Sequence, residues 1–427
     1  MLKALDLRDE RASLDLVLPR PIDAGANVRE PVSRIIEQVR DQGDSALLAL
    51  TAQFDGVSLS TTRVSPEEIA QARAGISPEL LAALKLAWSR ILEYHGAGHE
   101  ESPAVEGDGI RVDHRSVPVD RAGIYAPGGL ARYPSSVLMG AAPAVVAGVA
   151  ELLLCVPPGP DGRIDDASLA AASIAGIGEV HAIGGAQAIA AMALGTQSIR
   201  RVDVIAGPGN AYVAEAKRQL SGTVGIAAGF AGPSEIAIVA DNSADPRLVA
   251  IDLMVQAEHG PDGMAWLISW SQELIDSCIS QLEVLVAASP RSEMLRSTFA
   301  SGGMSCLVRD LAQAMEVSNT VAPEHLELQL EAMGEAVELV RCAGAVFCGP
   351  WAPASLGDYA AGPNHILPTN RTARFGSALR ADDFRRHIHI VTVSEAGFRA
   401  LAPSVELLAT TEGLNAHADS IRMRFEQ

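Results

Sequence analysis

Apolar residues in the first hundred positions recur at helical spacing. They repeat every three to four residues and the run stops at Gly43, as in Val32, Ile35, Ile36 and Val39. Residues 65–68, Ser-Pro-Glu-Glu, offer an N-cap, a proline at the first helical position and a capping-box glutamate. We therefore predict amphipathic helices here, which form a covering layer and contain no catalytic residues.

From Ile110 the pattern changes to short aliphatic runs, each ending in a glycine-rich turn and leading into an alanine-rich helical stretch. Strand, tight turn and helix repeated at this spacing are typical of a doubly wound parallel sheet. The runs form two series and predict two α/β halves: 124–125, 152–156, 180–183 and 202–205, then 236–240, 264–269, 306–308 and 345–347. A last strand-like run, 388–393, precedes helical segments.

Hydropathy and charge narrow the class of protein. The apolar window 137–156 is interrupted by Pro143 and Glu151, so we expect a buried helix followed by a buried strand instead of a membrane span. A formal net charge of −19 argues against nucleic acid and anionic membranes as partners. The five scattered cysteines and an N-terminus without an apolar signal segment predict reduced thiols and a cytoplasmic location.

Glycine turns after strands are candidate phosphate cradles. Residues 207–210, Gly-Pro-Gly-Asn, supply two glycines, but Tyr212 occupies the third position of the dinucleotide fingerprint, so plain tight turns remain an alternative. Gln256 and His259 lie three apart after a helical pattern and would share one helix face, where they suit a zinc-like ion. The alternative is a histidine that only hydrogen-bonds the helix end.

Glu324 and His325 are adjacent after a proline turn and would form a proton-transfer pair if both enter a cleft. The alternative is a solvated helix start. Asp358 and His417 lie in or near glycine-containing turns, where ligands can be presented, and each is weak evidence alone.

A set of longer blocks extends along nearly the whole chain. The blocks are GIYAPGG (123–129), YPSSVLM (133–139), GGAQAIA (184–190), GPGNAYVAEAKR (207–218), AGPSE (231–235), QAEH (256–259), APEHLEL (322–328), GDYAAGPNHILPT (357–369) and EGLNAHADSIRMR (412–424). In their order and spacing, these blocks resemble the histidinol dehydrogenase family.

This resemblance implies a zinc-dependent, NAD-linked homodimer that oxidises L-histidinol to L-histidine in two steps. It implies zinc ligands Gln256, His259, Asp358 and, from the partner subunit, His417. It also implies an acid/base pair, Glu324 and His325; these ligands, with Ser234, His325 and Glu412, as substrate contacts; and an NAD site lined by Tyr125, Gln187 and Asn210. A histidine suits removal of the hydroxyl proton, and a neighbouring carboxylate suits activation of the water that the second oxidation needs.

For the fold we expect two similar Rossmann-like α/β domains, one inserted in the other. Residues 20–121 and 234–378 would form the first domain, with most zinc and catalytic residues, and 122–233 the second, on the NAD side. The return of strand signals after residue 235 and the family's insertion motivate this division. Extensions 1–19 and 379–427 would take part in dimerisation, the latter docking on the partner subunit.

Several positions depart from the family's usual residues: Ala227, Gly260, Arg371, Gly376, Ala378 and Arg380. The added arginines motivate one alternative, a zinc- and NAD-dependent paralogue acting on another small amino alcohol or a diol such as a sulfopropanediol. A metal-dependent hydrolase is a second alternative, although it leaves the predicted NAD-site residues without a task. A non-catalytic binding protein would leave Glu324 and His325 unexplained.

Overall fold

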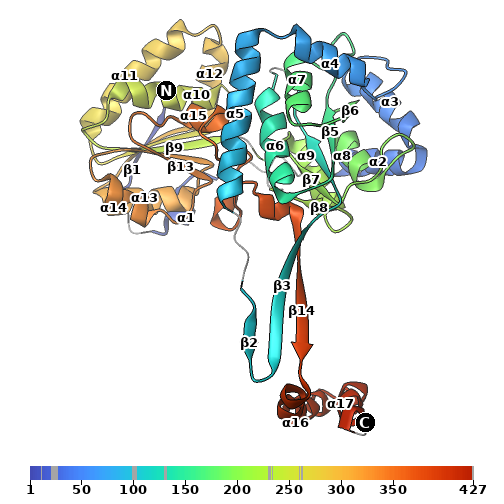
Figure 1. Cartoon of the computed structure of the whole chain (residues 1–427). Coiled ribbons are helices and arrows are strands. Elements are labelled where there is room, and N and C mark those ends of the chain that lie inside the picture. Colours follow the sequence, from blue (N-terminus) through green and yellow to red (C-terminus); the bar gives the residue numbers. More distant parts are fainter. Residues whose placement is uncertain are drawn as a thin grey trace. The chain divides into compact units, whose positions relative to one another are not determined.

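The computed structural model describes residues 1–10, 12–20, 27–98, 103–128, 132–228, 232, 234–258, 260 and 263–425. The chain divides into two compact units (Figure 1). The large unit consists of Met1–Ala97 and Val119–Phe384, and the small unit of Gly98–Pro118 and Arg385–Gln427.

The first sheet of the large unit is parallel and six-stranded, in the order β1-β11-β10-β9-β12-β13. Its strands are β1 (Lys3–Asp6), β9 (Glu235–Ala240), β10 (Met264–Ser269), β11 (Gly303–Leu307), β12 (His325–Gln329) and β13 (Ala345–Cys348). Ile236 and Ile238 of β9 face one way and Ala237 and Val239 the other, and each set packs in its own apolar core.

Helices cover both faces of this sheet (Figure 1). The core around Ile236 includes residues of α10 (Pro246–Ala257), α11 (Gln272–Ala288) and α12 (Ser292–Gly302). The core around Ala237 includes residues of α1 (Leu14–Val17), α13 (Leu311–Val321) and α14 (Met333–Leu339). A short helix, α15 (Ala354–Tyr359), follows β13.

The second sheet is parallel and five-stranded, in the order β6-β5-β4-β7-β8. Its strands are β4 (Arg121–Tyr125), β5 (Glu151–Val156), β6 (Glu179–Ala182), β7 (Val204–Ala206) and β8 (Gly225–Ile226). One core holds residues of α4 (Pro66–Gly75), α5 (Pro78–Ala97), α6 (Pro134–Ala147) and α7 (Asp166–Ile174). The other holds residues of α2 (Arg29–Gln42), α3 (Asp44–Phe54), α8 (Gly185–Leu194) and α9 (Ala211–Leu220).

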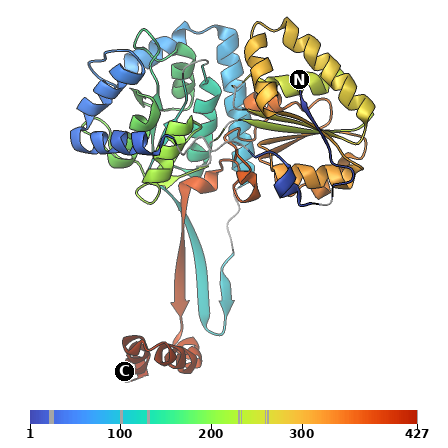
Figure 2. The same ribbon diagram turned by 180° about the vertical axis from the view of Figure 1, so that it is seen from behind.

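The small unit is an antiparallel sheet with a helix pair (Figure 2). β14 (Arg385–Val393) pairs along its nine residues with β3 (Ile110–Pro118), and β2 (Val105–Gly107) pairs with the other edge of β3. α16 (Glu395–Thr411) packs on α17 (Asn415–Arg422), and the rings of Phe398 and Phe425 lie 5.5 Å apart. The described residues also include short 3₁₀ turns at Thr372–Arg374, Ala381–Phe384 and Met423–Phe425.

The predicted fold class, with two parallel α/β halves, is confirmed. The apolar window 137–156 is a buried helix and a buried strand, α6 and β5, as expected. The capping box is present too, since the Ser65 hydroxyl accepts a hydrogen bond from Glu68 N at 3.1 Å. Within the described part of the chain, we find no helix with the length and apolar character needed to cross a membrane.

Two features differ from the expected division of the chain. β1 pairs with β11 of the same chain, so residues 3–6 belong to the first sheet and not to an extension on a partner. The helices of residues 29–97, expected with the first sheet, bury their apolar faces against the second. Periodicity identifies which face of a helix is apolar, but not which sheet receives it.

Three of the five cysteines are buried, Cys155, Cys278 and Cys306, while Cys342 is partly buried and Cys348 exposed, all as free thiols.

Candidate active site

Glu324 and His325 lie at the amino-terminal end of the strands of the first sheet. β12 begins at His325, and its parallel neighbour β9 begins at Glu235, so the first residues of both strands share one edge. The Glu324 carboxylate is buried, and its Oε2 accepts a hydrogen bond from Glu235 N at 3.0 Å. The sequence alternative of a solvated helix start is wrong, because both side chains are buried at a strand start.

The His325 imidazole contacts two carboxylates and a carbonyl. Its Nδ1 lies 3.2 Å from the Glu235 carbonyl oxygen, and since a carbonyl only accepts, Nδ1 carries the hydrogen. Nδ1 is also 3.6 Å from Glu324 Oε2, and Nε2 is 3.5 Å from Asp358 Oδ1. Nε2 is therefore the nitrogen that can accept or release a proton on the Asp358 side.

Burial and charge shift the pKa values of this pair. Burial raises the pKa of Glu324 to about 7, although the positive charge of His325 opposes the shift. Burial alone would lower the pKa of His325, but Glu324, Asp358 and the Glu235 carbonyl outweigh it and raise the pKa to about 9. In each group, the opposite charge of the other counteracts the effect of burial on the pKa.

The predicted metal ligands fall into three groups. Asp358 lies near the end of α15 and reaches His325, as given above. Gln256 lies in the last turn of α10, where its Nε2 is buried and has no hydrogen-bond partner among the described residues. His259 lies outside the described residues, and His417 belongs to α17 of the small unit, where it is exposed.

The predicted substrate contacts also come from both units of the chain. Ser234 precedes β9 directly, and its carbonyl accepts a hydrogen bond from Met264 N at 3.1 Å. A Cβ on Gly263 would meet the carbonyls of both Ser234 and Gln256, so Ser234 and the end of α10 flank the same position. Glu412 is the C-cap of α16 and exposed, and it belongs to the small unit.

No group of three or more His, Cys, Asp or Glu side chains suited to a metal was found in the part of the chain that the structure describes. The predicted ligand set contains a glutamine, a residue outside that part and a residue of the other unit.

The three predicted NAD-site residues lie in the second sheet, at the carboxyl-terminal end of its strands. Tyr125 ends β4, and its hydroxyl oxygen accepts a hydrogen bond from Gly185 N at 3.1 Å. Gln187 is buried in the first turn of α8. Asn210 is the N-cap of α9, and its Oδ1 accepts from Tyr212 N and Val213 N, each at 3.1 Å. The N-termini of α8 and α9 therefore point to the end of the sheet where these residues lie.

The turn after β7 requires a glycine. Gly207 has φ of 120°, and a Cβ there would lie 1.9 Å from the Tyr125 carbonyl oxygen. Lys217 of α9 is buried and donates a hydrogen bond from Nζ to the Gly207 carbonyl. Burial lowers the pKa of Lys217 to about 8.

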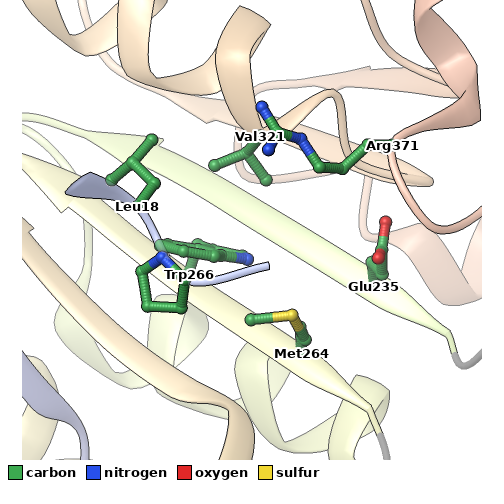
Figure 3. Close-up of a pocket in the computed structure, with 7 residues that line it drawn as sticks. Leu18, Glu235, Met264, Trp266, Val321 and Arg371 are labelled. Atoms are coloured by element: carbon green, nitrogen blue, oxygen red, sulfur yellow. The ribbon is translucent and has the colours of Figure 1, made fainter. Parts of the chain in front are cut away.

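Sequence reasoning missed two residues that support the site. Glu235 binds Glu324 and His325 through its backbone, while its buried side chain borders a small pocket with Arg371 (Figure 3). Burial and the nearby Glu324 raise the pKa of Glu235 to about 8. His365 Nδ1 donates to the Asp358 carbonyl at 2.9 Å, and its Nε2 lies 3.1 Å from Ser136 Oγ of α6. The resemblance blocks contain both residues, but nothing in their spacing marks them.

The structure gives Arg371 a different role from recognition of an anionic substrate. Its guanidinium forms an ion pair with Asp15 at 2.5 Å and donates to the Thr320 carbonyl. Its backbone is left-handed, with φ of 63°, a conformation that glycine adopts more easily than other residues. Arg371 therefore ties the segment after residue 369 to α1 and α13.

Comparison with known proteins assigns the class and then the family. A family model described as histidinol dehydrogenase matches residues 18–425. Histidinol dehydrogenase of Gluconobacter oxydans is 46% identical over 404 residues, covering 94% of each chain. Histidinol dehydrogenase of a Synechococcus strain is 45% identical, covering 98% of this chain and 97% of its own.

A solved structure agrees. The crystal structure of histidinol dehydrogenase from Elizabethkingia anophelis matches with a TM-score of 0.94 and 33% identity, covering 100% of this chain and 98% of that one. These relatives are oxidoreductases, and the protein is an enzyme of that class. The chain belongs to the histidinol dehydrogenase family.

Proposed function

We propose that this protein oxidises L-histidinol to L-histidine through L-histidinaldehyde, as the last steps of histidine biosynthesis, with NAD as hydride acceptor. The observation that carries the proposal is the buried contact between Glu324 and His325, 3.6 Å apart, with Asp358 on the other side of the imidazole. The family membership supports the substrate and the NAD-linked reaction.

In its neutral form, the minor form below its pKa of about 9, the His325 imidazole takes the hydroxyl proton of the alcohol as the carbinol carbon gives its hydride to the first NAD. Glu324 takes a proton from a water molecule that adds to the aldehyde. The resulting hydrate anion transfers a second hydride to a second NAD, loses one proton and becomes the carboxylate. Each oxidation therefore transfers two electrons. The Glu235 backbone forms hydrogen bonds with both side chains and fixes the position of Glu324 relative to His325.

Gln256, His259, Asp358 and His417 would hold a zinc ion in this site. The Gln256 side chain is buried in the last turn of α10, and its amide oxygen is a neutral donor that suits such an ion. Amide oxygen, imidazole and carboxylate are donors that zinc accepts. When bound, zinc supplies a positive centre that anchors the imidazole and amine of the substrate.

Ser234, Glu412 and His325 would contact the substrate alongside the ligand residues. Glu412 would pair with the substrate amine, since a carboxylate favours a cation. Tyr125, Gln187 and Asn210 would line the NAD site at the ends of the second sheet's strands, which is the usual position for ligands of parallel α/β sheets.

The active form would be a homodimer with shared sites. The small unit exposes many large apolar side chains, which in a monomer would face water: Val105, Ile388, Ile390, Val391, Val393, Leu401, Leu407, Leu408 and Met423. A surface of this kind is typical of one covered by another chain. A second copy covering it would bring His417 and Glu412 to the partner's site.

The direct test is incubation of the purified protein with L-histidinol, NAD and zinc. We expect two NADH for each histidinol consumed and L-histidine as the product. No NADH above a boiled control, with zinc supplied, would contradict the proposal. A panel of other small amino alcohols and diols should give lower kcat/KM than histidinol.

A further inference from the structure

Two exposed histidines face each other across the sheet of the small unit. His114 of β3 and His389 of β14 are direct partners in the antiparallel ladder, and their rings lie edge to face with centroids 5.0 Å apart. The two strands lie side by side along their length (Figure 1). Neither histidine belongs to the site proposed above, and both lie outside the blocks that resemble the family.

The separation of the two rings fits a shared metal ion. An ion 2.0–2.1 Å from a ring nitrogen is about 3.2 Å from the centroid of that ring, so two rings on one ion have centroids about 4.5–5.2 Å apart at bond angles of about 90–109°. The observed 5.0 Å lies within this range. Both side chains are exposed, so each ring can rotate to turn a nitrogen toward the ion, and a hydrated ion can reach them.

The backbone fixes the two side chains opposite each other. β3 and β14 pair at nine consecutive positions, from Arg385 with Pro118 to Val393 with Ile110, and the histidine pair occupies the middle one. Side chains directly opposite each other in an antiparallel sheet have Cβ atoms about 4.5–5.5 Å apart. Both ligands are therefore in place before an ion arrives, which lowers the entropic cost of binding.

His387 lies on the same face, two residues before His389, but its surroundings differ. Its partner in the ladder is Ser116, whose hydroxyl and carbonyl oxygens accept hydrogen bonds from the Arg385 guanidinium at 2.6 and 2.9 Å. A positive charge beside this pair disfavours a cation there. Since the described residues contain no metal-binding group of three or more His, Cys, Asp or Glu, water would complete the shell of the ion.

The sheet of the small unit lacks an apolar core. None of the residues of β2, β3 and β14 is buried. A sheet of so few strands is marginally stable without further packing, and small structures of this kind gain stability from a bound metal. An ion held by one ligand from each strand would tie β3 to β14 and stabilise the folded sheet.

We propose that His114 and His389 form a second metal site, which takes a divalent transition-metal ion such as Zn²⁺, Ni²⁺ or Cu²⁺ and cross-links β3 to β14. Imidazole nitrogen suits these ions, whereas Mg²⁺ and Ca²⁺ prefer oxygen ligands. This inference is independent of the proposed active-site zinc, whose ligands are other residues.

The test is calorimetric titration of the full-length, zinc-loaded protein with Zn²⁺. Protein that already holds the proposed active-site zinc should bind one further equivalent per subunit. His114→Thr and His389→Thr each remove one ligand and insert a residue that favours strands. We expect either substitution to weaken binding of the further equivalent about tenfold or more, because two ligands on one scaffold bind far more tightly than one.

His387→Thr is the matched control, since it removes an exposed histidine from the same strand and the same face. Its affinity for the further ion should stay within about threefold of the unsubstituted protein. Amide hydrogen exchange reports the cross-link itself. Zn²⁺ should slow exchange in β3 and β14 of the unsubstituted protein, but not in His389→Thr.

The outcomes separate this site from the proposed active site. Absence of a further equivalent in the unsubstituted protein contradicts the second site, and so does a further equivalent that persists in both His114→Thr and His389→Thr. Equal losses in His387→Thr and His389→Thr contradict the assignment to two residues. A protein that binds a single equivalent, lost in His389→Thr, supports the second site and contradicts the proposed active-site zinc.

Discussion

Asn364 donates a hydrogen bond from Nδ2 to Nε2 of His95 at 3.3 Å, so the buried imidazole at the end of α5 is an acceptor and is neutral at Nε2. The same amide nitrogen donates to the Met139 carbonyl of α6 at 2.7 Å. Asn364 therefore fastens α5 to α6, and protonation of His95 would break one of its two bonds.

This contact predicts a loss of stability in acid. Burial lowers the pKa of His95 to about 4, below the ordinary 6.5 of an unfolded chain. Between these values the unfolded state binds more protons, so stability falls as the pH falls from 6.5 toward 4. Urea unfolding at pH 7 and pH 5 should show that the unsubstituted protein loses at most about 2 kcal/mol more than His95→Gln.

His181 is a second buried histidine whose pKa burial lowers to about 4, and it is present in both proteins, so its contribution cancels in this comparison. Equal losses in the two proteins would show that His95 is not responsible.

Glu324→Gln should separate the two oxidations. The amide keeps an oxygen that accepts from Glu235 N, so the fold should persist, but it cannot take a proton from water. We expect oxidation of L-histidinaldehyde to fall 100-fold or more and reduction of the aldehyde with NADH to fall less. Rapid-mixing measurements of both reactions check this. A parallel decline in both would instead assign Glu324 to proton transfer from the alcohol.

Mixed dimers test the shared site. His417→Ala and Glu324→Gln should each be nearly inactive, but a hybrid has one site with both substitutions and one with neither. After subunit exchange of equal amounts, half the dimers are hybrids, so activity should return to about a quarter of the unsubstituted value. If exchange is demonstrated and activity stays at the level of the separate variants, His417 serves its own subunit.

Lys217→Met should weaken NAD binding while leaving the reacting groups untouched. Without the Nζ bond to the Gly207 carbonyl, the turn between β7 and α9 loses the group that fixes it beside Tyr125. We expect KM for NAD to rise about tenfold, equivalent to about 1.4 kcal/mol, with little change in kcat. Lys85→Met, on the exposed side of α5, is the control and should change neither constant. A fall in kcat alone would contradict this role.

The sequence predicts most of the strands because apolar runs between glycine turns are distinctive. It misses β12, the strand that carries His325, because His325, Glu327 and Gln329 alternate with leucines and make the segment look half solvated. All three are buried, since the polar face of β12 meets α10 and α15 instead of water. The sequence pattern shows which residues are polar, but it does not show which buried groups will bind them.

The candidate residues were found mainly through the resemblance, and the structure brings only some of them together. His325 and Asp358 meet at 3.5 Å although 33 positions separate them, a distance that no spacing rule predicts. His259 lies outside the described residues, and Glu412 and His417 belong to the small unit. Their roles stay predictions that the dimer and zinc experiments address.

The packing of residues 29–97 on the second sheet has a consequence for synthesis on the ribosome. The strands and most of the core of that half come from residues 29–226, so it can fold while the rest of the chain is still being made. β1 leaves the ribosome first, yet its partner β11 follows about 300 residues later, and β3 waits for β14. The nascent chain must therefore keep β1 unpaired through most of translation.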